Sequence, residues 1–412
     1  MIRHQIYFDT LGTMREDSAA WRSVFAGLSV MRLVDTFTDA GSASKPAAGW
    51  AELHSVRAAI EEMSEGDPMR GVLTAVVEEV STRKAVDDTV SRTLMAYGRA
   101  LDSEASWSLA TDVFATVAKL TKPERNARLA VEANVAVGGA ARRNGDWDTS
   151  ARAYSQAAYI ADTLGDHAGV LTVQVGIANT YFAKGNLPQA QTILDDVIVQ
   201  ARDQDLANVL GMALHSRAAI SHLRGDYGQA LKLAYEAFNL TADTSERELI
   251  LSDIAAGFSA LDMRDSARDA LLIASATSQG KRARWQATIN LLELAGIDQD
   301  EKSFDGHNAE LRNAPMGPWL RSHYLLILGE GLVHFDRFEH AKAALNEAID
   351  YASANQVHKV VFQAESALKT LASAVSSARR TASKPVFFQP TQEVLEVARS
   401  ITRLREAALA AY

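Results

Sequence analysis

Small and apolar residues recur along the chain with helical spacing, and one stretch shows the pattern twice. Between residues 170 and 241, the Gly, Ala and apolar positions of a first segment return forty residues later in a second. The paired positions are Ala178 and Ala218, Gly185 and Gly225, Leu187 and Tyr227, Ala190 and Ala230, Leu194 and Ala234, and Val197 and Ala237. Apolar residues at i, i+4 and i+7 on either side of a Gly predict two amphipathic helices joined by a tight turn.

The first copy shows what each position requires. Ala178 gives a second helix room to cross the first, and Gly185 ends the first helix in a left-handed conformation that other residues adopt at a higher cost. Pro188 stands in the first turn of the second helix, where its missing N–H does no harm. One such hairpin cannot bury its apolar stripe alone, so we expect the copies to stack.

The pattern extends well beyond these two copies. A small residue marks the helix crossing at Ala59, Gly98, Gly138, Ala178, Ala218, Ala255 and Gly329. A second small residue, early in the following helix, stands at Gly71, Ala110, Ser150, Ala190, Ala230, Ala267 and Ala341. A bulky residue opens that helix at Trp107, Trp147, Leu187, Tyr227 and Phe338. One copy, centred on Phe304, is degenerate, with Leu292 in place of the small residue.

In this pattern the chain resembles the tetratricopeptide repeat (TPR) proteins, although its period of 37–40 residues exceeds their usual period of about 34. The resemblance implies an all-α fold, a right-handed superhelical solenoid of antiparallel helix pairs with capping helices at both ends. We predict an N-terminal helical cap and loop over 1–49, about eight repeats over 50–356 with the degenerate copy at 281–314, and C-terminal helices over 357–412. A basic Pro/Phe loop at 376–392 interrupts the last region.

Composition narrows the class of protein. The chain has 412 residues, 47% hydrophobic and 23% charged, and no cysteine, which excludes disulfides and thiolate metal sites. We find no signal-peptide pattern and no apolar run long enough for a membrane span, so we expect a cytoplasmic protein. The net charge of −9 disfavours nucleic acid as a partner, although residues 281–285 (Lys-Arg-Ala-Arg-Trp) form an isolated basic aromatic tract.

No motif predicts an enzyme or a cofactor. Glycine-rich phosphate loops and the His-Glu-x-x-His zinc motif are absent, and Ser81 and Lys84 match an acyl-enzyme motif by spacing alone. His215 and His222 would lie about 10.5 Å apart along one helix axis. That separation is too large for both to bind one metal ion at about 2.1 Å, so we predict no metal site.

The resemblance places the first helix of each repeat on the concave surface, where ligand-facing positions carry polar residues. The positions equivalent to these are Arg92, Arg99, Arg142, Arg143, Asn179, His215 and His222, followed later in the chain by Glu293, His323, Glu330 and His334. Charge-assisted hydrogen bonds from Arg99, Arg142 and Arg143 would suit an acidic peptide or helix. The alternative is that about half of these residues are only solvated surface.

The expected function is therefore a scaffold or adaptor that holds a peptide or helix of a partner protein in its concave groove. The alternative is a bacterial regulator in which a bound ligand or peptide switches a TPR sensor superhelix, because an N-terminal helical extension followed by repeats near forty residues is similar to such proteins. The final helix, from about Thr391 to Ala411, carries an apolar stripe. It either caps the last repeat or mediates homodimerisation.

Overall fold

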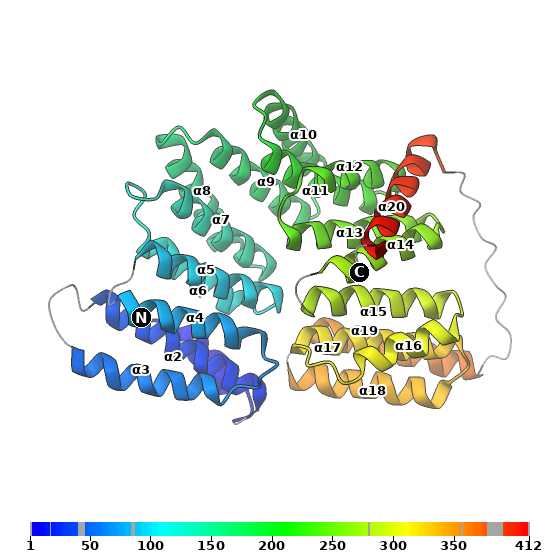
Figure 1. Ribbon diagram of the computed structural model, residues 1–412, viewed down its shortest axis with the longest axis horizontal. Coiled ribbons are helices and arrows are strands. Elements are labelled where there is room, and N and C mark those ends of the chain that lie inside the picture. Colours follow the sequence, from blue (N-terminus) through cyan, green and yellow to red (C-terminus); the bar gives the residue numbers. More distant parts are fainter. Residues whose placement is uncertain are drawn as a thin grey trace. The chain divides into compact units, whose positions relative to one another are not determined.

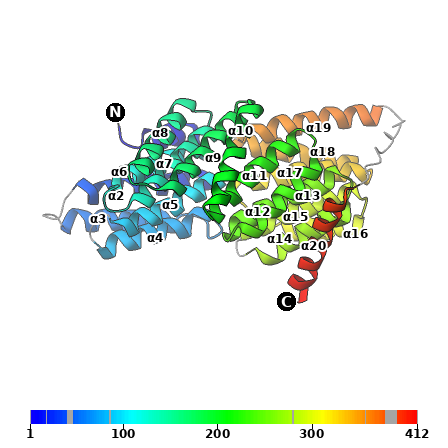
Figure 2. The same ribbon diagram turned by 90° about the horizontal axis from the view of Figure 1, so that it is seen from above.

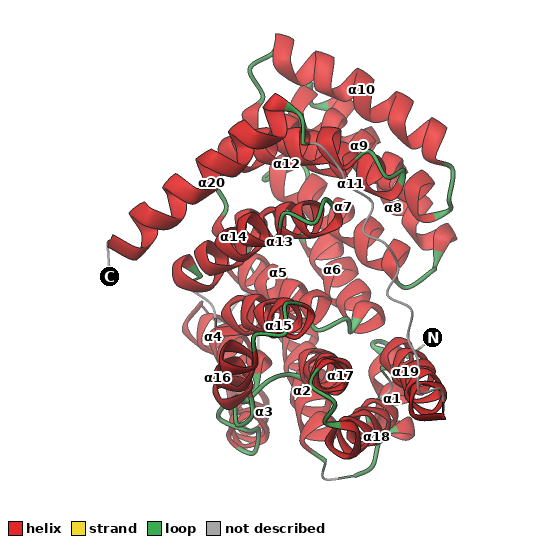
Figure 3. Cartoon of the chain, turned by 90° about the vertical axis from the view of Figure 1, so that its right-hand side faces the viewer, coloured by secondary structure: helices red, strands yellow, loops and turns green. Residues whose placement is uncertain are grey.

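The chain forms helices that pack largely in chain order within two compact units (Figure 1). The structure is a computed structural model that describes residues 2–16, 18–39, 46–83, 87–278, 281–355, 357–376 and 390–410. The N-terminal unit comprises Met1–Ala183 and the C-terminal unit Lys184–Tyr412. All regular structure in the described residues is helical (Figure 3), as the sequence pattern predicts.

The helices of the N-terminal unit are α1 (Gln5–Thr13), α2 (Ala19–Asp39), α3 (Pro46–Glu61), α4 (Pro68–Arg83), α5 (Asp88–Ser103), α6 (Trp107–Leu120), α7 (Ala127–Arg143), α8 (Trp147–Thr163) and α9 (His167–Ala183). Those of the C-terminal unit are α10 (Leu187–Asp203), α11 (Ala207–Leu223), α12 (Tyr227–Leu240), α13 (Thr244–Ala260), α14 (Arg264–Thr277), α15 (Lys281–Ile297), α16 (Glu301–Leu311), α17 (Pro318–His334), α18 (Phe338–Ala354), α19 (His358–Ser376) and α20 (Gln392–Ala410). We call the odd-numbered helices from α3 to α19 the A helices and the even-numbered helices from α4 to α18 the B helices.

Small residues lie where an A helix meets its B helix, as predicted. A Cβ atom on Gly98 would approach the Phe114 ring to 2.4 Å, and one on Gly138 would approach the Tyr154 ring to 2.8 Å. Both distances are far inside van der Waals contact at about 3.5–4.0 Å. Ala110, Ala178, Ala190, Ala267 and Ala341, at the predicted small positions, are fully buried.

The turns between helices also follow the repeat pattern. Gly185 has a φ of +80°, which confirms the left-handed conformation predicted for it. The next residue, Asn186, caps α10 by accepting a hydrogen bond from the backbone N–H of Gln189. The equivalent glycines, each followed by a capping Asp, are Gly145 and Gly225.

Two details of the first repeat differ from the prediction. The Gly71 position is exposed, and a Cβ atom there would meet nothing within 4 Å, so its assignment as a close-packing position is wrong. Leu73, two residues on, is fully buried in its place. In addition, α3 begins at Pro46, because proline is well suited to the first turn of a helix. The sequence pattern predicts a loop at this proline, which is wrong.

The degenerate repeat reverses the usual sizes of the contacting residues. Phe304 of α16 stands at the position where the other repeats have Gly, Ala or Ser, and it is fully buried. The facing A helices supply the missing space: a Cβ on Gly331 would lie 2.3 Å from the Phe304 ring, and one on Gly296 would lie 3.2 Å from Gly331 Cα. The glycines therefore let α15 and α17 approach each other above a large aromatic ring.

The N-terminal helix α1 is fastened to α2, α5 and α6 by polar groups. His4 Nδ1 lies 2.5 Å from an Asp112 carboxylate oxygen, and its Nε2 lies 3.3 Å from Asp35. The Tyr7 hydroxyl is 3.1 Å from that of Tyr97 in the core. Ile6 of α1 also packs against the hydrophobic core, whereas Ile2 and Phe8 are 65% and 40% exposed.

The C-terminal helix α20 packs against α12 and α14 (Figures 2 and 3). The prediction that it caps the last repeat is therefore wrong. Thr402 and Arg405 donate hydrogen bonds of 2.8 and 2.7 Å to the buried carboxylate of Asp269 on α14. The apolar stripe of α20 (Val394, Val397, Ala398 and Ile401) is buried within this unit. Most of the predicted loop, residues 377–389, lies outside the described residues.

Candidate binding site

Two of the arginines predicted to meet a ligand connect neighbouring A helices. Arg143 of α7 makes a bidentate contact with Asp102 of α5, at 2.9 Å from Nε and 2.6 Å from Nη2. Arg99 of α5 forms an ion pair with Glu132 of α7. These two pairs place a carboxylate beside each arginine, so less positive charge is available to an acidic ligand than the sequence suggests.

Three further predicted residues lie in the same unit. Arg142 faces the Tyr154 phenol, whose pKa is raised by burial and pulled back partly by this guanidinium. The Arg142 Nε is buried and has no hydrogen-bond partner in the described part of the chain. Arg92 on α5 is exposed, and Asn179 on α9 is half-buried.

The two predicted histidines belong to α11, in the C-terminal unit. His215 Nε2 lies 2.7 Å from an Asp253 carboxylate oxygen on α13, and His222 packs edge-on against Tyr227 at 5.1 Å between ring centroids. Each histidine thus has its own neighbour. No group of three or more potential metal ligands occurs among the residues the structure describes.

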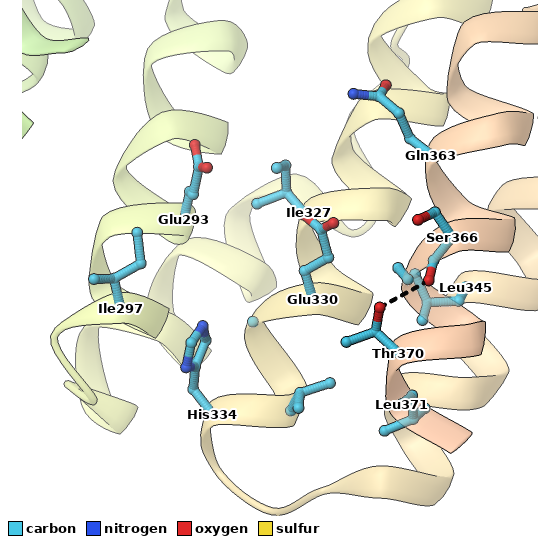
Figure 4. Close-up of a pocket in the computed structure, with 13 residues that line it drawn as sticks. Glu293, Ile297, Ile327, Glu330, His334, Leu345, Gln363, Ser366, Thr370 and Leu371 are labelled. Carbon is cyan, nitrogen blue, oxygen red and sulfur yellow. Dashed lines mark hydrogen bonds between the residues drawn. The ribbon is translucent and has the colours of Figure 1, made fainter. Parts of the chain in front are cut away.

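A recess opens at the A helices of the C-terminal unit (Figure 4). Its volume is about 460 Å³, within the range of about 300–1,000 Å³ that is typical of ligand sites. We call it the A-helix pocket. Its lining comes from α15 (Glu293 and Ile297), α17 (Ile327, Glu330, Gly331, Val333 and His334), α18 (Leu345) and α19 (Gln363, Ser366, Ala367, Thr370 and Leu371).

The packing of three A helices shapes this pocket. The contact between Gly296 and Gly331 draws α15 and α17 together. Leu345 of α18 reaches the pocket beside Gly329, where a Cβ would come within 2.6 Å of the leucine side chain. On the α19 side, Thr370 Oγ1 donates a hydrogen bond of 3.0 Å to the Ser366 backbone oxygen, which orients its methyl group and hydroxyl at the wall (Figure 4).

Glu293 and Glu330 give the pocket a negative charge. They project from α15 and α17, as Figure 4 shows, and neither forms an ion pair with a described residue. Burial raises the pKa of Glu293 above 4.5, its ordinary value. The pKa of Glu330 is raised by burial and also by the negative charge of Glu293. The negative charge of Glu293 therefore acts on Glu330, and both side chains are exposed at the open pocket.

The repeat register indicated three residues of this site. Glu293, Glu330 and His334 stand at positions that the register assigns to the ligand-facing surface, and all three line the pocket. His323, assigned in the same way, is instead stacked on Trp319 at 5.4 Å, and burial lowers its pKa to about 4.

The α19 residues Gln363, Ser366 and Thr370 were missed, because the array was expected to end at residue 356. The helix predicted after Tyr351 could have revealed them. It follows the B helix α18, so α19 is a ninth A helix.

The basic aromatic tract stands at the start of α15. The Trp285 side chain is half-buried and packs against the hydrophobic core of α15–α19. No helix among the described residues has both the length and the apolar character that crossing a membrane requires.

Comparison with known proteins finds similarity in structure only. No family model matches the chain, and no curated protein matches it in sequence. Among solved structures, NprR in complex with its cognate peptide NprX is 15% identical, with 85% of this chain and 92% of that chain covered at a TM-score of 0.46. The apo form of the quorum sensor NprR from B. thuringiensis is 14% identical, with 84% and 92% covered at 0.43.

A putative kinesin light chain from Podosopora anserina with nearly identical TPR-like repeats is 15% identical over 47% of this chain and 96% of that chain, at a TM-score of 0.37. Consecutively packed helix pairs, with small residues at the crossings and a glycine turn before the B helices α8, α10 and α12, give both units of this chain a TPR-like helical-repeat fold.

Proposed function

We propose that this chain is a binding protein that holds a segment of another protein on the A helices, with the A-helix pocket as its principal contact. The observation that supports the proposal is the pocket itself. Three A helices bring together apolar walls, such as Ile297 and Ile327, and polar groups, such as Gln363. A few polar groups on apolar walls are the usual composition of a recognition site.

The repeat packing supports this role because it fixes the pocket before a ligand arrives. Glycine contacts and buried aromatic rings hold α15 and α17 in place, so binding need not order the backbone. Such pre-organisation lowers the entropic cost of association. We therefore interpret the chain as a scaffold or adaptor, in which specificity comes from side chains on stacked A helices.

A contribution from Arg92, Arg99, Arg142 and Arg143 to an acidic partner remains a second proposal for the N-terminal unit. Arg92 is the clearest probe of it, because this residue is exposed. Reversing the charge of Arg99 or Arg143 would also break the contacts with Glu132 or Asp102, so a loss of binding in those variants would have two explanations.

The test uses a displayed random-peptide library selected on the whole chain. In the pocket variant Gln363→Trp/Thr370→Trp, two indoles fill the α19 wall. The matched control, Lys342→Trp/Asn346→Trp, adds the same groups at exposed positions of α18 outside the pocket lining.

We expect selected peptides to bind the wild type and the control equally and the pocket variant at least about tenfold more weakly, the effect of losing about 1.4 kcal/mol. Failure to enrich any peptide, or equal binding to all three proteins, would contradict the proposal. Small-angle scattering with the same peptides then distinguishes a static scaffold from a switched regulator, since only the latter changes its dimensions on binding.

A further inference from the structure

The unpaired carboxylates of the A-helix pocket identify the kind of residue it recognises. We infer that Glu293 and Glu330 together bind the cationic head of a lysine or arginine side chain presented by the partner segment. The inference rests on the proposed function and names the chemistry of the ligand.

The first reason is the contrast with other carboxylates between neighbouring helices of this chain. Asp102 and Glu132 are neutralised by arginines, Asp253 contacts His215, and Asp298 lies within 2.9 Å of Arg264 and 2.6 Å of Arg268. This fold thus commonly places a cation across from such an acid. In the described residues, Glu293 and Glu330 have no such counterpart.

The second reason is the electrostatic situation of the pair. Both side chains are exposed at the open pocket, and the negative charge of Glu293 raises the pKa of Glu330, so a cation placed beside the two carboxylates would be favourable. A guanidinium group has five N–H donors in a planar fork, and an ammonium group has three, so either can contact two carboxylates at once.

The third reason is the shape and composition of the pocket. Its apolar lining includes Ile297, Ile327 and Val333, near the carboxylates on α15 and α17. The methylene stem of a lysine or arginine packs well on such a surface while its charged head reaches polar groups. On the other wall, the side chains of Gln363 and Ser366 can accept or donate hydrogen bonds to a peptide backbone.

A metal ion is a poorer match to these residues. Calcium takes about six to eight oxygen ligands, and magnesium demands near-ideal octahedral geometry. The described residues contain no group of three or more metal-ligating side chains. A cationic side chain needs only the two carboxylates and the apolar walls.

The experiment is a double-mutant cycle between peptide and protein. In each selected peptide, every arginine is replaced singly by citrulline, its neutral isostere, and every lysine by glutamine. Affinities are measured by fluorescence anisotropy on the full chain. The proteins are the wild type, the pocket variant Glu293→Gln/Glu330→Gln, and the control Glu339→Gln/Glu365→Gln, which makes the same charge change at exposed sites outside the pocket lining.

We expect one basic residue whose neutralisation weakens binding to the wild type and to the control about tenfold or more, as for a lost charge-assisted hydrogen bond. The same peptide change should have less than about a twofold effect on the Glu293→Gln/Glu330→Gln variant, because its cation no longer has a charged counterpart. Circular dichroism verifies that this variant is folded. If it is not, Glu330→Gln alone takes its place in the cycle.

Three outcomes overturn the inference. In the first, no basic residue of a bound peptide matters. In the second, a basic residue matters equally in the pocket variant, so its site is elsewhere. These two outcomes leave the proposed function intact. Failure to select any peptide would instead contradict both the proposed function and this inference. In the third, spermidine alone binds in a Glu330-dependent manner more tightly than any peptide, which would assign the pocket to a free amine.

Discussion

The contact between Gly331 and Phe304 offers a sharp test of how the degenerate repeat is packed. In Gly331→Ala, the new methyl carbon would lie 2.3 Å from Phe304 Cε2 and 2.8 Å from Cζ. The ring cannot move aside easily, because it is fully buried and packs 5.0 Å from the Phe335 ring. Relief therefore requires α17 to shift relative to α16, or the ring to leave its preferred rotamer.

The magnitude follows from two opposing effects. Overpacking a well-filled core costs about 1–3 kcal/mol, and an overlap of more than about 1 Å, judged against a normal carbon contact, places this case near the upper end. Replacing a helical Gly by Ala contributes about 1 kcal/mol in the other direction. We expect a net loss of about 2 kcal/mol in the free energy of unfolding.

The assay is urea denaturation with Gly306→Ala as the matched control. Gly306 lies in α16, and a Cβ there would meet nothing within 4 Å, so this change should stabilise the fold by about 1 kcal/mol. The two Gly→Ala changes should thus have opposite signs. In the Gly331→Ala background, Phe304→Leu should cost less than it does in the wild type. If Gly331→Ala stabilises the protein as Gly306→Ala does, the packing described for this repeat is wrong.

Three other predictions concern separate parts of the chain. Burial alone would lower the pKa of His4, but its hydrogen bond and charge interaction with Asp112, with a further contribution from Asp35, raise the pKa above 6.5. The resulting stability is fully present below pH 6.5 and is lost as the pH rises through the raised pKa. Hydrogen exchange in α1 should therefore accelerate across that pH window. Asp112→Asn should abolish most of this pH-dependent acceleration. Ala105 has a φ of +59°, so Ala105→Gly should raise the free energy of unfolding by about 1 kcal/mol. The thermal midpoint should rise accordingly, and an unchanged midpoint would contradict the strain. Arg405→Met should leave the buried Asp269 carboxylate with one fewer partner and lower the stability of the docked α20 by about 1.5–3 kcal/mol. Proteolysis within α20 should then be faster, whereas unaltered proteolysis would show that this contact does not hold the helix.

Local features of the fold could be predicted because they depend on neighbours in sequence. The size of Gly98 and Gly138 matches the aromatic ring that each faces on the following helix. The φ of Gly185 is set by the end of its own helix. Each of these positions repeats at a nearly constant interval, so a wrong assignment at one, such as Gly71, leaves the register of the others unchanged.

Contacts between distant segments could not be predicted in the same way. The stripe on α20 shows that this helix is buried, but an apolar stripe fits many surfaces. Its specific partner, Asp269, is 136 residues from Arg405 in sequence. The attachment of α1 likewise depends on Asp112, 108 residues from His4. Single residues at such separations leave no periodic signal.

In the candidate site, too, the positions of residues could be predicted but their contacts could not. The register placed Glu293 and Glu330 on the ligand-facing surface, but it could not show which charged residues there are already paired. Arg99 and Arg143 contact carboxylates 33 and 41 residues away, or roughly one repeat. Comparing charges one repeat apart would have indicated that these arginines were paired.

The return of α20 onto α12 and α14 has a consequence for how the C-terminal unit unfolds. A helical-repeat array is nearly one-dimensional, so its end repeats can fray without disturbing the middle. Here the last helix is fastened to the middle of the array through Asp269, which places α15–α19 inside a closed loop of chain. Fraying from that end must first break the closure, so loss of structure in this unit should be cooperative. Closing so long a loop carries an entropic cost during folding and should make α20 one of the last elements to dock.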